Sequence, residues 1–260
     1  MGIEFMGLFL LFIFGAIIGS FLNVVILRHN TGKSLAGRSG CMVCQAQLSG
    51  TELVPIISYV CQLGKCTSCK SKISRQYILV ELATATLFAL VGWFALVHSL
   101  SYFVTALLLI AMAILVILAT YDFKHTILPD KYTYSFAIIG ALAVGIMQPY
   151  TYQFGWQLIG GITTALPIFA LWYFSRGRAM GFGDVKLSVG IGIFLGVYLG
   201  ITAIWYGFII GAVYGLVLMV LRKAGAKSEV AFGPFLILGF LIAFFTQVGF
   251  MEVVNSLMFI

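Results

Sequence analysis

Two aspartates stand at the edges of apolar segments, where a carboxylate is costly and usually functional. Asp122 closes the uncharged stretch 101–121, and Asp184 follows Gly181-Phe182-Gly183 and opens a second apolar run. Two carboxylates that meet cannot both ionise easily, so one keeps a proton as the acid while the other is the base that activates water. The pair therefore predicts a membrane-embedded aspartyl protease.

The same aspartates also have structural interpretations, which the sequence alone leaves open. Asp184 is spaced to cap the helix that follows it, and either Asp184 or Asp122 could pair with a nearby lysine. Asp130 is expected to cap a helix, and it is the reserve candidate for the partner of Asp184. Lys124 and Lys186 are expected to anchor at lipid headgroups.

Four cysteines form two CxxC motifs that are typical of a metal site. Cys41 and Cys44 make the first motif, Cys66 and Cys69 make the second, and 21 residues lie between the motifs. Two such turns supply four thiolates for a tetrahedral Zn²⁺, which leaves no open position for catalysis. The zinc would therefore be structural. A set of reduced cysteines without metal is the alternative, and Cys61 is expected to be a packing residue.

The composition identifies the elements that must position these residues. Of 260 residues, 62% are hydrophobic and only 9% are charged, which excludes an ordinary soluble domain. We predict an all-α polytopic membrane protein with about eight transmembrane helices. The eight apolar stretches are 5–27, 77–97, 101–121, 132–148, 156–174, 185–199, 200–221 and 230–250. The sixth and seventh are so close that one long helix with a re-entrant turn is the alternative.

The basic residues predict the orientation of the chain. All fifteen fall in alternate connections between the predicted spans: Arg28, Lys33, Arg38, Lys65, Lys70, Lys72 and Arg75; Lys124 and Lys131; Arg176, Arg178 and Lys186; Arg222, Lys223 and Lys227. The other connections carry none. This positive-inside pattern puts the basic connections in the cytoplasm and both termini outside.

The net charge of +7 is therefore mainly a signal of topology, with attraction to anionic membrane lipid as a secondary effect. Nucleic acid is a poor partner, because the basic residues are scattered over four membrane-adjacent loops instead of one face. We therefore expect the chain to be surrounded by membrane lipid and to have no nucleic-acid partner.

We predict three regions along the chain: a first transmembrane helix over 1–28, a cytoplasmic four-cysteine loop over 29–76, and a membrane domain of about seven transmembrane helices over 77–260. The loop has no strong hydrophobic core, so a bound metal would hold it together. Because disulfides are disfavoured in the cytoplasm, structural zinc is favoured over a disulfide pair.

Five motifs occur in order along nearly the whole chain. They are Ser20-Phe21-Leu22-Asn23-Val24-Val25, the paired CxxC motifs, Tyr77-Ile78-Leu79-Val80-Glu81, Asp122 with Leu128-Pro129-Asp130, and Gly181-Phe182-Gly183-Asp184-Val185-Lys186-Leu187. The Gly-Phe-Gly-Asp element alone is weak, since presenilin-like proteases and flagellin peptidases also carry that pattern. As a set, the five motifs resemble the type IV prepilin peptidases.

The resemblance implies a bacterial inner-membrane aspartyl endopeptidase with Asp122 and Asp184 as its catalytic pair. It implies removal of a short basic leader from type IV prepilins or pseudopilins, after a glycine, at the cytoplasmic face. Full-length members of that family also methylate the new N-terminal amine with S-adenosylmethionine, and the resemblance associates this activity with the loop 29–76. The implied cellular roles are type IV pilus assembly and protein secretion.

The loop departs from the pattern of that family in two places. Met42 stands where proline is usual in the first CxxC motif, and residues 50–55 replace a run similar to Trp-Tyr-Asp-Asn-Ile-Pro. Glu52 is the candidate to keep the acidic function of that run, towards the methyl donor or the amine. A protease of the same kind without methyltransferase activity is the alternative.

Two interpretations from other functional classes compete with the enzyme. A transporter or channel would use membrane carboxylates for ions, and it predicts inverted repeats and charges near the midplane. Here the aspartates lie at membrane edges and no repeat is visible in the sequence. A non-catalytic assembly component would use the four-cysteine loop as a docking module.

Overall fold

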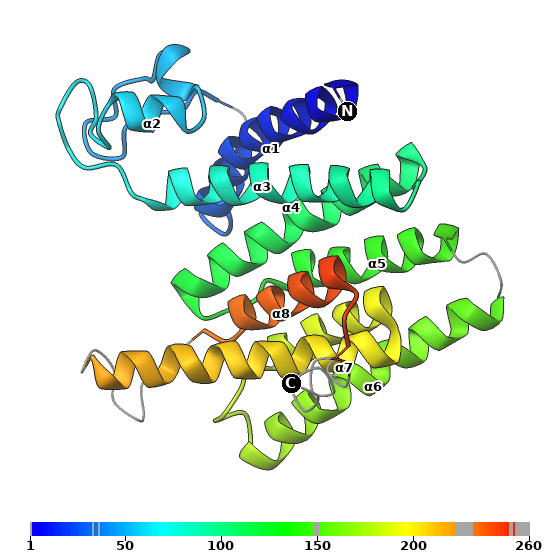
Figure 1. Ribbon diagram of the computed structural model, residues 1–260. Helices are drawn as coiled ribbons and strands as arrows, with labels where there is room; N and C mark the ends of the chain where they lie inside the picture. The colour runs from blue at the N-terminus through cyan, green and yellow to red at the C-terminus, as the bar shows by residue number, and fades with distance from the viewer. Residues whose placement is uncertain are drawn as a thin grey trace. The chain divides into compact units, whose positions relative to one another are not determined.

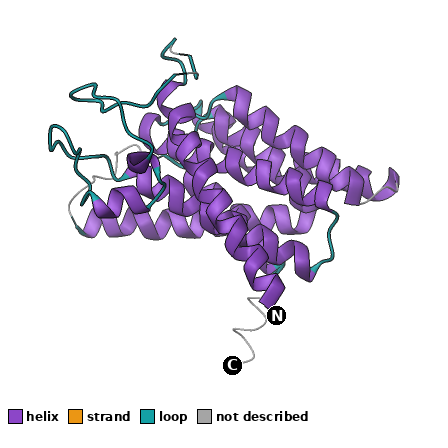
Figure 2. Cartoon of the chain, turned by 90° about the horizontal axis from the view of Figure 1, so that it is seen from above, coloured by secondary structure: helices purple, strands orange, loops and turns teal. Residues whose placement is uncertain are grey.

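The computed structural model describes residues 2–32, 34–35, 37–147, 151–221, 231–249 and 252. Within these ranges the regular secondary structure is helical, and the only strand-like pairing is two isolated β-bridges (Figure 2). The prediction of an all-α protein is confirmed. The chain forms two compact units, Met1–Thr105 and Ala106–Ile260.

The first unit is built on two packed helices, α1 over Gly2–Arg28 and α3 over Gln76–Val97 (Figure 1). Gly15 and Gly19 of α1 make the closest approach, because a Cβ atom added to either would lie only 2.7–2.8 Å from the backbone of α3. Gly15 meets a later part of α3 than Gly19 does, so the helices are antiparallel. Small residues at four-residue spacing permit such packing in lipid.

The connection between α1 and α3 carries little regular structure. It contains a 3-10 turn, η1 over Thr51–Leu53, and a five-residue helix, α2 over Ile57–Cys61. Cys66 is the one buried side chain among the residues of this connection that the structure describes. The loop therefore lacks a hydrophobic core, as its composition predicts.

The second unit holds the remaining helices, with α4 beginning just before the division. They are α4 over Tyr102–His125, α5 over Asp130–Met147, α6 over Thr151–Ser175, α7 over Phe182–Val220 and α8 over Gly233–Thr246. Helix α7 packs against α5, α6 and α8, and it is therefore the central helix of this unit (Figure 1).

Helix α7 is interrupted at Gly196, whose φ of 75° and ψ of −174° lie outside the helical region. The chain reverses there, because a Cβ atom on Gly200 would lie 3.2 Å from the Cα atom of Gly192. Residues eight apart in a straight helix are about 12 Å apart. The two segments correspond to the predicted spans 185–199 and 200–221, with the break at Gly196 instead of between them.

An aromatic cluster joins three helices of the second unit. Phe136 of α5 lies 5.1 Å from Phe194 of α7 and 5.5 Å from Phe240 of α8, measured between ring centroids. Phe194 and Phe240 are 5.6 Å apart, so the three rings contact one another. Offset and edge-to-face ring pairs stabilise more than their buried area alone provides. The cluster holds α5 and α8 against the first segment of α7.

Five described helices are long and apolar enough to cross a membrane: α1, α3, α4, α6 and α7. Helix α7 has two segments, and α5 and α8 are shorter, so the described chain has the eight predicted apolar helical segments. Four basic residues used to predict the orientation, Lys33, Arg222, Lys223 and Lys227, lie outside the described residues.

The compact units divide the chain at residue 105, whereas the predicted regions divide it after residues 28 and 76. The difference arises because α3 packs on α1 and so belongs with the first span. The assignment of methyl transfer to 29–76 and of proteolysis to 77–260 concerns activity, and it stays a prediction.

Candidate active site and metal centre

Asp122 lies in the last turn of α4 and is only 4% exposed. Its Oδ2 atom accepts a hydrogen bond of 2.9 Å from the backbone N–H of Gly233. Gly233 is the first residue of α8, so this N–H has no partner within its own helix. A helix N-terminus carries partial positive charge, which favours a carboxylate there. The contact fixes Asp122 against the start of α8.

Asp184 lies in the first turn of α7 and is 7% exposed. The helix begins at Phe182 with Gly181 as its N-cap residue, and the N–H of Asp184 donates to the carbonyl of Gly181 at 3.2 Å. The interpretation of Asp184 as the helix cap is therefore wrong. Its carboxylate, like that of Asp122, lies at the N-terminus of a helix.

The fold of the second unit brings the two aspartates to the same place, because Leu128 lies against a glycine beside each of them. Leu128 packs on the glycines that accompany them. A Cβ atom on Gly183 would lie 3.0 Å from Leu128, and one on Gly233 would lie 3.2 Å from it. A larger residue at either glycine would push apart the elements that carry the carboxylates.

Asp130 forms an ion pair with Lys186, whose Nζ atom lies 2.7 Å from Oδ1. Lys186 also lies over the rings of Tyr134 and Phe182, at 5.4 and 5.3 Å from their centroids. The structure thus gives Lys186 protein partners beyond the headgroups that we expected for it. Asp130 is 60% exposed and bound to this cation, whereas Asp122 is buried and accepts the N–H of Gly233. The ion pair joins the first residue of α5 to the second turn of α7.

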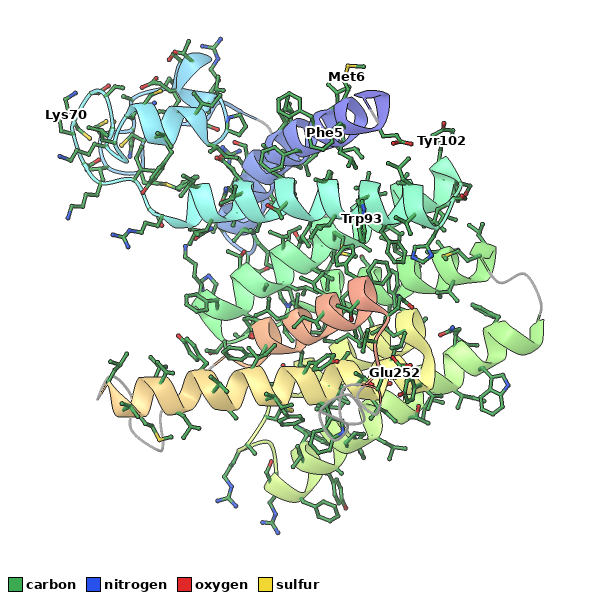
Figure 3. All side chains as sticks on the ribbon, in the orientation of Figure 1. Phe5, Met6, Lys70, Trp93, Tyr102 and Glu252 are labelled. Carbon is green, nitrogen blue, oxygen red and sulfur yellow. The ribbon has the colours of Figure 1, made fainter. Side chains whose placement is uncertain are left out.

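The two CxxC motifs fold into two copies of one turn. Cys41 and Cys66 each donate their N–H to the carbonyl five residues further on, at 3.0 and 2.9 Å. The carbonyl of Cys41 also accepts a 3.0 Å hydrogen bond from the N–H of Gln45, and the carbonyl of Cys66 accepts one of the same length from Lys70. Gln45 and Lys70 have the same φ of 59°. Figure 3 shows Lys70 at the edge of the loop, pointing outward.

The two turns bring four sulfurs together. The Sγ atoms of Cys41, Cys44, Cys66 and Cys69 all lie within 4.8 Å of one another, and those of Cys41 and Cys69 are 3.8 Å apart. A tetrahedral zinc with bonds of about 2.3 Å holds its sulfurs about 3.8 Å apart. No cysteine is in a disulfide, and Cys61 lies outside the cluster. The four thiols therefore fit a tetrahedral metal ion.

The thiols influence one another's ionisation. Backbone N–H groups, that of Cys44 first, lower the pKa of Cys41 to about 6, and Ser71 lowers the pKa of Cys69 through its hydroxyl and its N–H. Although the N–H of Ala46 acts in the opposite direction, the neighbouring thiols and desolvation raise the pKa of Cys44 to about 11. Thiolates in contact repel one another, and a bound cation deprotonates all of its thiol ligands.

Glu52 uses both carboxylate oxygens within the loop. Oε2 accepts hydrogen bonds of 2.7 and 2.8 Å from the N–H and the hydroxyl of Ser49, and Oε1 accepts one from the hydroxyl of Thr67. Thr67, and then Ser49, lower the pKa of Glu52. Because Thr67 stands between Cys66 and Cys69, Glu52 links η1 to the second cysteine turn. These contacts are structural, and cofactor binding by Glu52 stays a prediction.

Comparison with known families finds matches in both halves of the chain. The family described as Bacterial Peptidase A24 N-terminal domain matches residues 13–95, and the Type IV leader peptidase family matches residues 109–216. The chain is 32% identical to the Prepilin leader peptidase/N-methyltransferase of Bacillus subtilis (strain 168), over 90% of this chain and 92% of that relative. The chain belongs to the type IV leader peptidase family.

Other relatives in the leader peptidase family also match over nearly their whole length. A Prepilin leader peptidase/N-methyltransferase of Vibrio cholerae is 29% identical, over 94% of this chain and 98% of the relative. A Type 4 prepilin-like proteins leader peptide-processing enzyme of Escherichia coli is 31% identical, over 91% and 93%. No solved structure matches the chain. The resemblance predicted from the motifs is confirmed, and the family and the apolar helices indicate an inner-membrane protein.

Two contacts of this leader peptidase site were not predicted from the sequence. The pair Gly233-Pro234 before an apolar run is typical of a helix start, but nothing in it indicates Asp122, which is 111 residues away. The pairing of Asp130 with Lys186 was not predicted either, because Asp130 was expected to cap a helix and Lys186 to anchor at lipid headgroups. Both contacts depend on how distant helices pack.

Proposed function

We propose that the chain is a membrane aspartyl endopeptidase that removes the leader of a type IV prepilin or pseudopilin, with Asp122 and Asp184 as its catalytic pair. One observation carries the proposal: two buried carboxylates lie at the N-termini of α8 and α7, beside glycines that pack on the same residue, Leu128. Both lie within residues 109–216, the part that matches the peptidase family. The names of the relatives supply the substrate class, a prepilin leader.

In the proposed reaction the two carboxylates share the proton transfers. Gly233 donates its N–H to Asp122, which favours Asp122 as the ionised member and therefore as the base. Asp122 takes a proton from a water molecule, whose oxygen attacks the carbonyl carbon of the scissile peptide. Asp184 gives its proton to the departing amine as the carbon–nitrogen bond breaks. The products are a free carboxylate and a new primary amine.

The glycines beside the aspartates support access by a peptide backbone. Gly181 and Gly183 place no side chain at the start of α7, so an extended substrate segment can approach Asp184 closely. The surrounding helices bury both carboxylates. A buried site makes the hydrogen bond from Gly233 and the interaction between the carboxylates stronger than they would be in water.

We place the cleavage site at the cytoplasmic face of the inner membrane. Lys124 lies in the last turn of α4 and Lys131 in the first turn of α5, on either side of the connection between these helices, and Arg176 and Arg178 lie in the connection from α6 to α7. These connections flank the two aspartates, and basic residues are enriched in cytoplasmic connections. The substrate would present its leader junction from the same side.

We further propose that the chain N-methylates the amine that cleavage produces, as the names of its relatives indicate for them. S-adenosylmethionine would supply the methyl group. Cys41, Cys44, Cys66 and Cys69 would hold a structural Zn²⁺, because the spacing of their sulfurs fits tetrahedral coordination. The metal would join two turns of a loop that has no hydrophobic core.

The proposed peptidase is tested with single aspartate variants of the purified full-length protein. Asp122→Asn and Asp184→Asn should each lower the rate of prepilin cleavage at least about a thousandfold, because each removes one of the two proton-transfer groups. Asp130→Asn is the matched control, and it should stay within about fivefold of the parent protein. Cleavage at the full rate by either of the first two variants would refute the assignment.

A further inference from the structure

Glu81 is a buried carboxylate that the proposed cleavage does not use. It lies in the second turn of α3, about 8 Å along the helix axis from Gln76, and only 7% of it is exposed. A charged side chain inside an apolar span is costly, and by default it indicates a functional site.

The groups beside the Glu81 carboxylate are neutral. Its Oε2 atom accepts a 2.7 Å hydrogen bond from the N–H of Ile56, and the hydroxyl of Ser20 lies near the carboxylate. Buried carboxylates are normally paired with a cation or a metal. Within the described part of the chain, no basic side chain forms an ion pair with Glu81. Its negative charge therefore lacks a positive partner from these residues.

A second polar contact lies one helical turn away, towards the loop. Asn23 is 1% exposed; its Nδ2 atom donates to the carbonyl of Tyr77 at 3.2 Å, and its Oδ1 atom accepts from Nε2 of Gln76 at 3.4 Å. The Oε1 atom of Gln76 is buried and has no hydrogen-bond partner among the described residues. This end of the α1–α3 pair thus holds a carboxylate without a cation and an acceptor without a donor, among the residues described.

A strained turn covers the carboxylate of Glu81. Ile56 has φ 63° and ψ −53°, and the N–H of Ile57 donates to the carbonyl of Pro55 at 2.6 Å, which makes a γ-turn of the rare positive-φ kind. This conformation is an outlier for a β-branched residue. Strained backbone persists only where its surroundings hold it, and it is concentrated at active sites and ligand clamps.

We infer that Glu81 and Gln76 form a binding site for a primary ammonium group. Such a group offers a positive charge, which the Glu81 carboxylate lacks, and three N–H donors, one of which could reach the Oε1 atom of Gln76. The inference rests on the proposed function, because leader cleavage creates a new primary amine and an N-methyltransferase must hold an amine. The expected ligand is therefore the N-terminal ammonium of the cleaved pilin. S-adenosylmethionine, the methyl donor, also carries a primary ammonium group and is the alternative ligand.

The turn at Ile56 lies between the carboxylate of Glu81 and the surface of its unit. The N–H of Ile56 occupies one oxygen of Glu81, and an ammonium group competes for the same oxygen. Release of the positive-φ conformation of Ile56 offsets the loss of that hydrogen bond. Ile57, the next residue, is 61% exposed, so the turn lies at the surface of its unit.

Peptide binding in the absence of methyl donor tests the site directly. The full chain in detergent micelles is titrated with an apolar peptide that has a free N-terminal amine and with its N-acetylated form. The parent protein should bind the free amine at least about tenfold more tightly, because a charge-assisted hydrogen bond is about twice as strong as a neutral one. Glu81→Gln should remove this preference, and Glu81→Asp, which keeps the charge, should retain most of it.

Thr84→Val is the matched control. Thr84 is fully buried in the same interface, and its hydroxyl donates to the carbonyl of Val80, away from the loop. This variant should keep the preference for the free amine. A preference that is unchanged in Glu81→Gln would overturn the inference.

Two further measurements separate the remaining outcomes. If Glu81→Gln weakens binding of S-adenosylhomocysteine and not of the peptide, the ammonium site stands, but the assignment to the pilin is overturned. If Glu81→Gln does not fold, Gln76→Met replaces it and should lower the preference about threefold; no change there refutes the site. A parent protein that binds the free amine but does not methylate it would refute only the proposed methyl transfer.

Discussion

The two units hold their chemical groups in different ways. In the second unit, two carboxylates are buried in a helix bundle, fixed by a backbone N–H and by contacts with glycines. In the first unit, four thiols lie on a loop in which Cys66 is the one buried side chain described. The carboxylate site depends on close packing, and the thiol site depends on a bound metal. Damage to one site should therefore leave the other intact.

Apart from the aspartate variants, the largest expected effect is the loss of the metal from the loop. Cys66→Ala should reduce bound zinc from about one equivalent to almost none and lower methyl transfer to background, because three thiolates no longer close the site. Prepilin cleavage should stay within about twofold of the parent rate. Metal analysis and mass spectrometry of the mature pilin measure these effects.

Cys61→Ala is the control for that variant, because Cys61 lies outside the sulfur cluster. It should keep both the zinc and the methyl transfer. A Cys66→Ala protein that retains both would show that the loop does not depend on a metal.

The next effect concerns packing at the carboxylates. A Cβ atom on Gly233 would lie 2.7 Å from the Oδ2 atom of Asp122, so Gly233→Ala should displace that carboxylate. A misplacement of about 1 Å can cost about a hundredfold in rate, and cleavage should fall by that order. Gly215→Ala adds the same methyl group where no atom lies within 4 Å, and it should cleave normally. Equal cleavage rates for the two variants would contradict the role of close packing.

The smallest effect is expected at the exposed ion pair beside the site. Lys186→Met should lower cleavage by no more than about fivefold, because exposed ion pairs stabilise little. Exchange of the charges, with Asp130→Lys and Lys186→Asp in one chain, should recover part of the loss. If the single variant cleaves no prepilin, the pair belongs to the catalytic machinery and not to its support.

Much of the fold followed from the sequence because apolar length and the positions of basic residues are local properties. The eight segments and the coreless loop were predicted on these grounds. The exact break in α7 was not, since Gly192, Gly196 and Gly200 each permit a reversal. The packing of the chain selects Gly196, whose Cα atom would lie 2.7 Å from a Cβ atom on Gly160 of α6.

The candidate site was predicted only in part for the same reason. Asp122, Asp184 and the four cysteines were nominated by residue type and spacing, and the structure brings each set together. The hydrogen bond from Gly233 to Asp122 and the bond from Ile56 to Glu81 join residues that are 111 and 25 positions apart. No local pattern encodes such pairs, because they exist only once the helices have packed.

The most direct test of the separation between the units uses a single variant and two substrates. Asp184→Asn is supplied with an intact prepilin and, separately, with a mature pilin that already has its free N-terminal amine. The account predicts that cleavage falls at least about a thousandfold, while zinc stays bound and methyl transfer to the mature pilin stays within about twofold of the parent rate. Loss of methyl transfer together with cleavage, or persistence of cleavage, would contradict it.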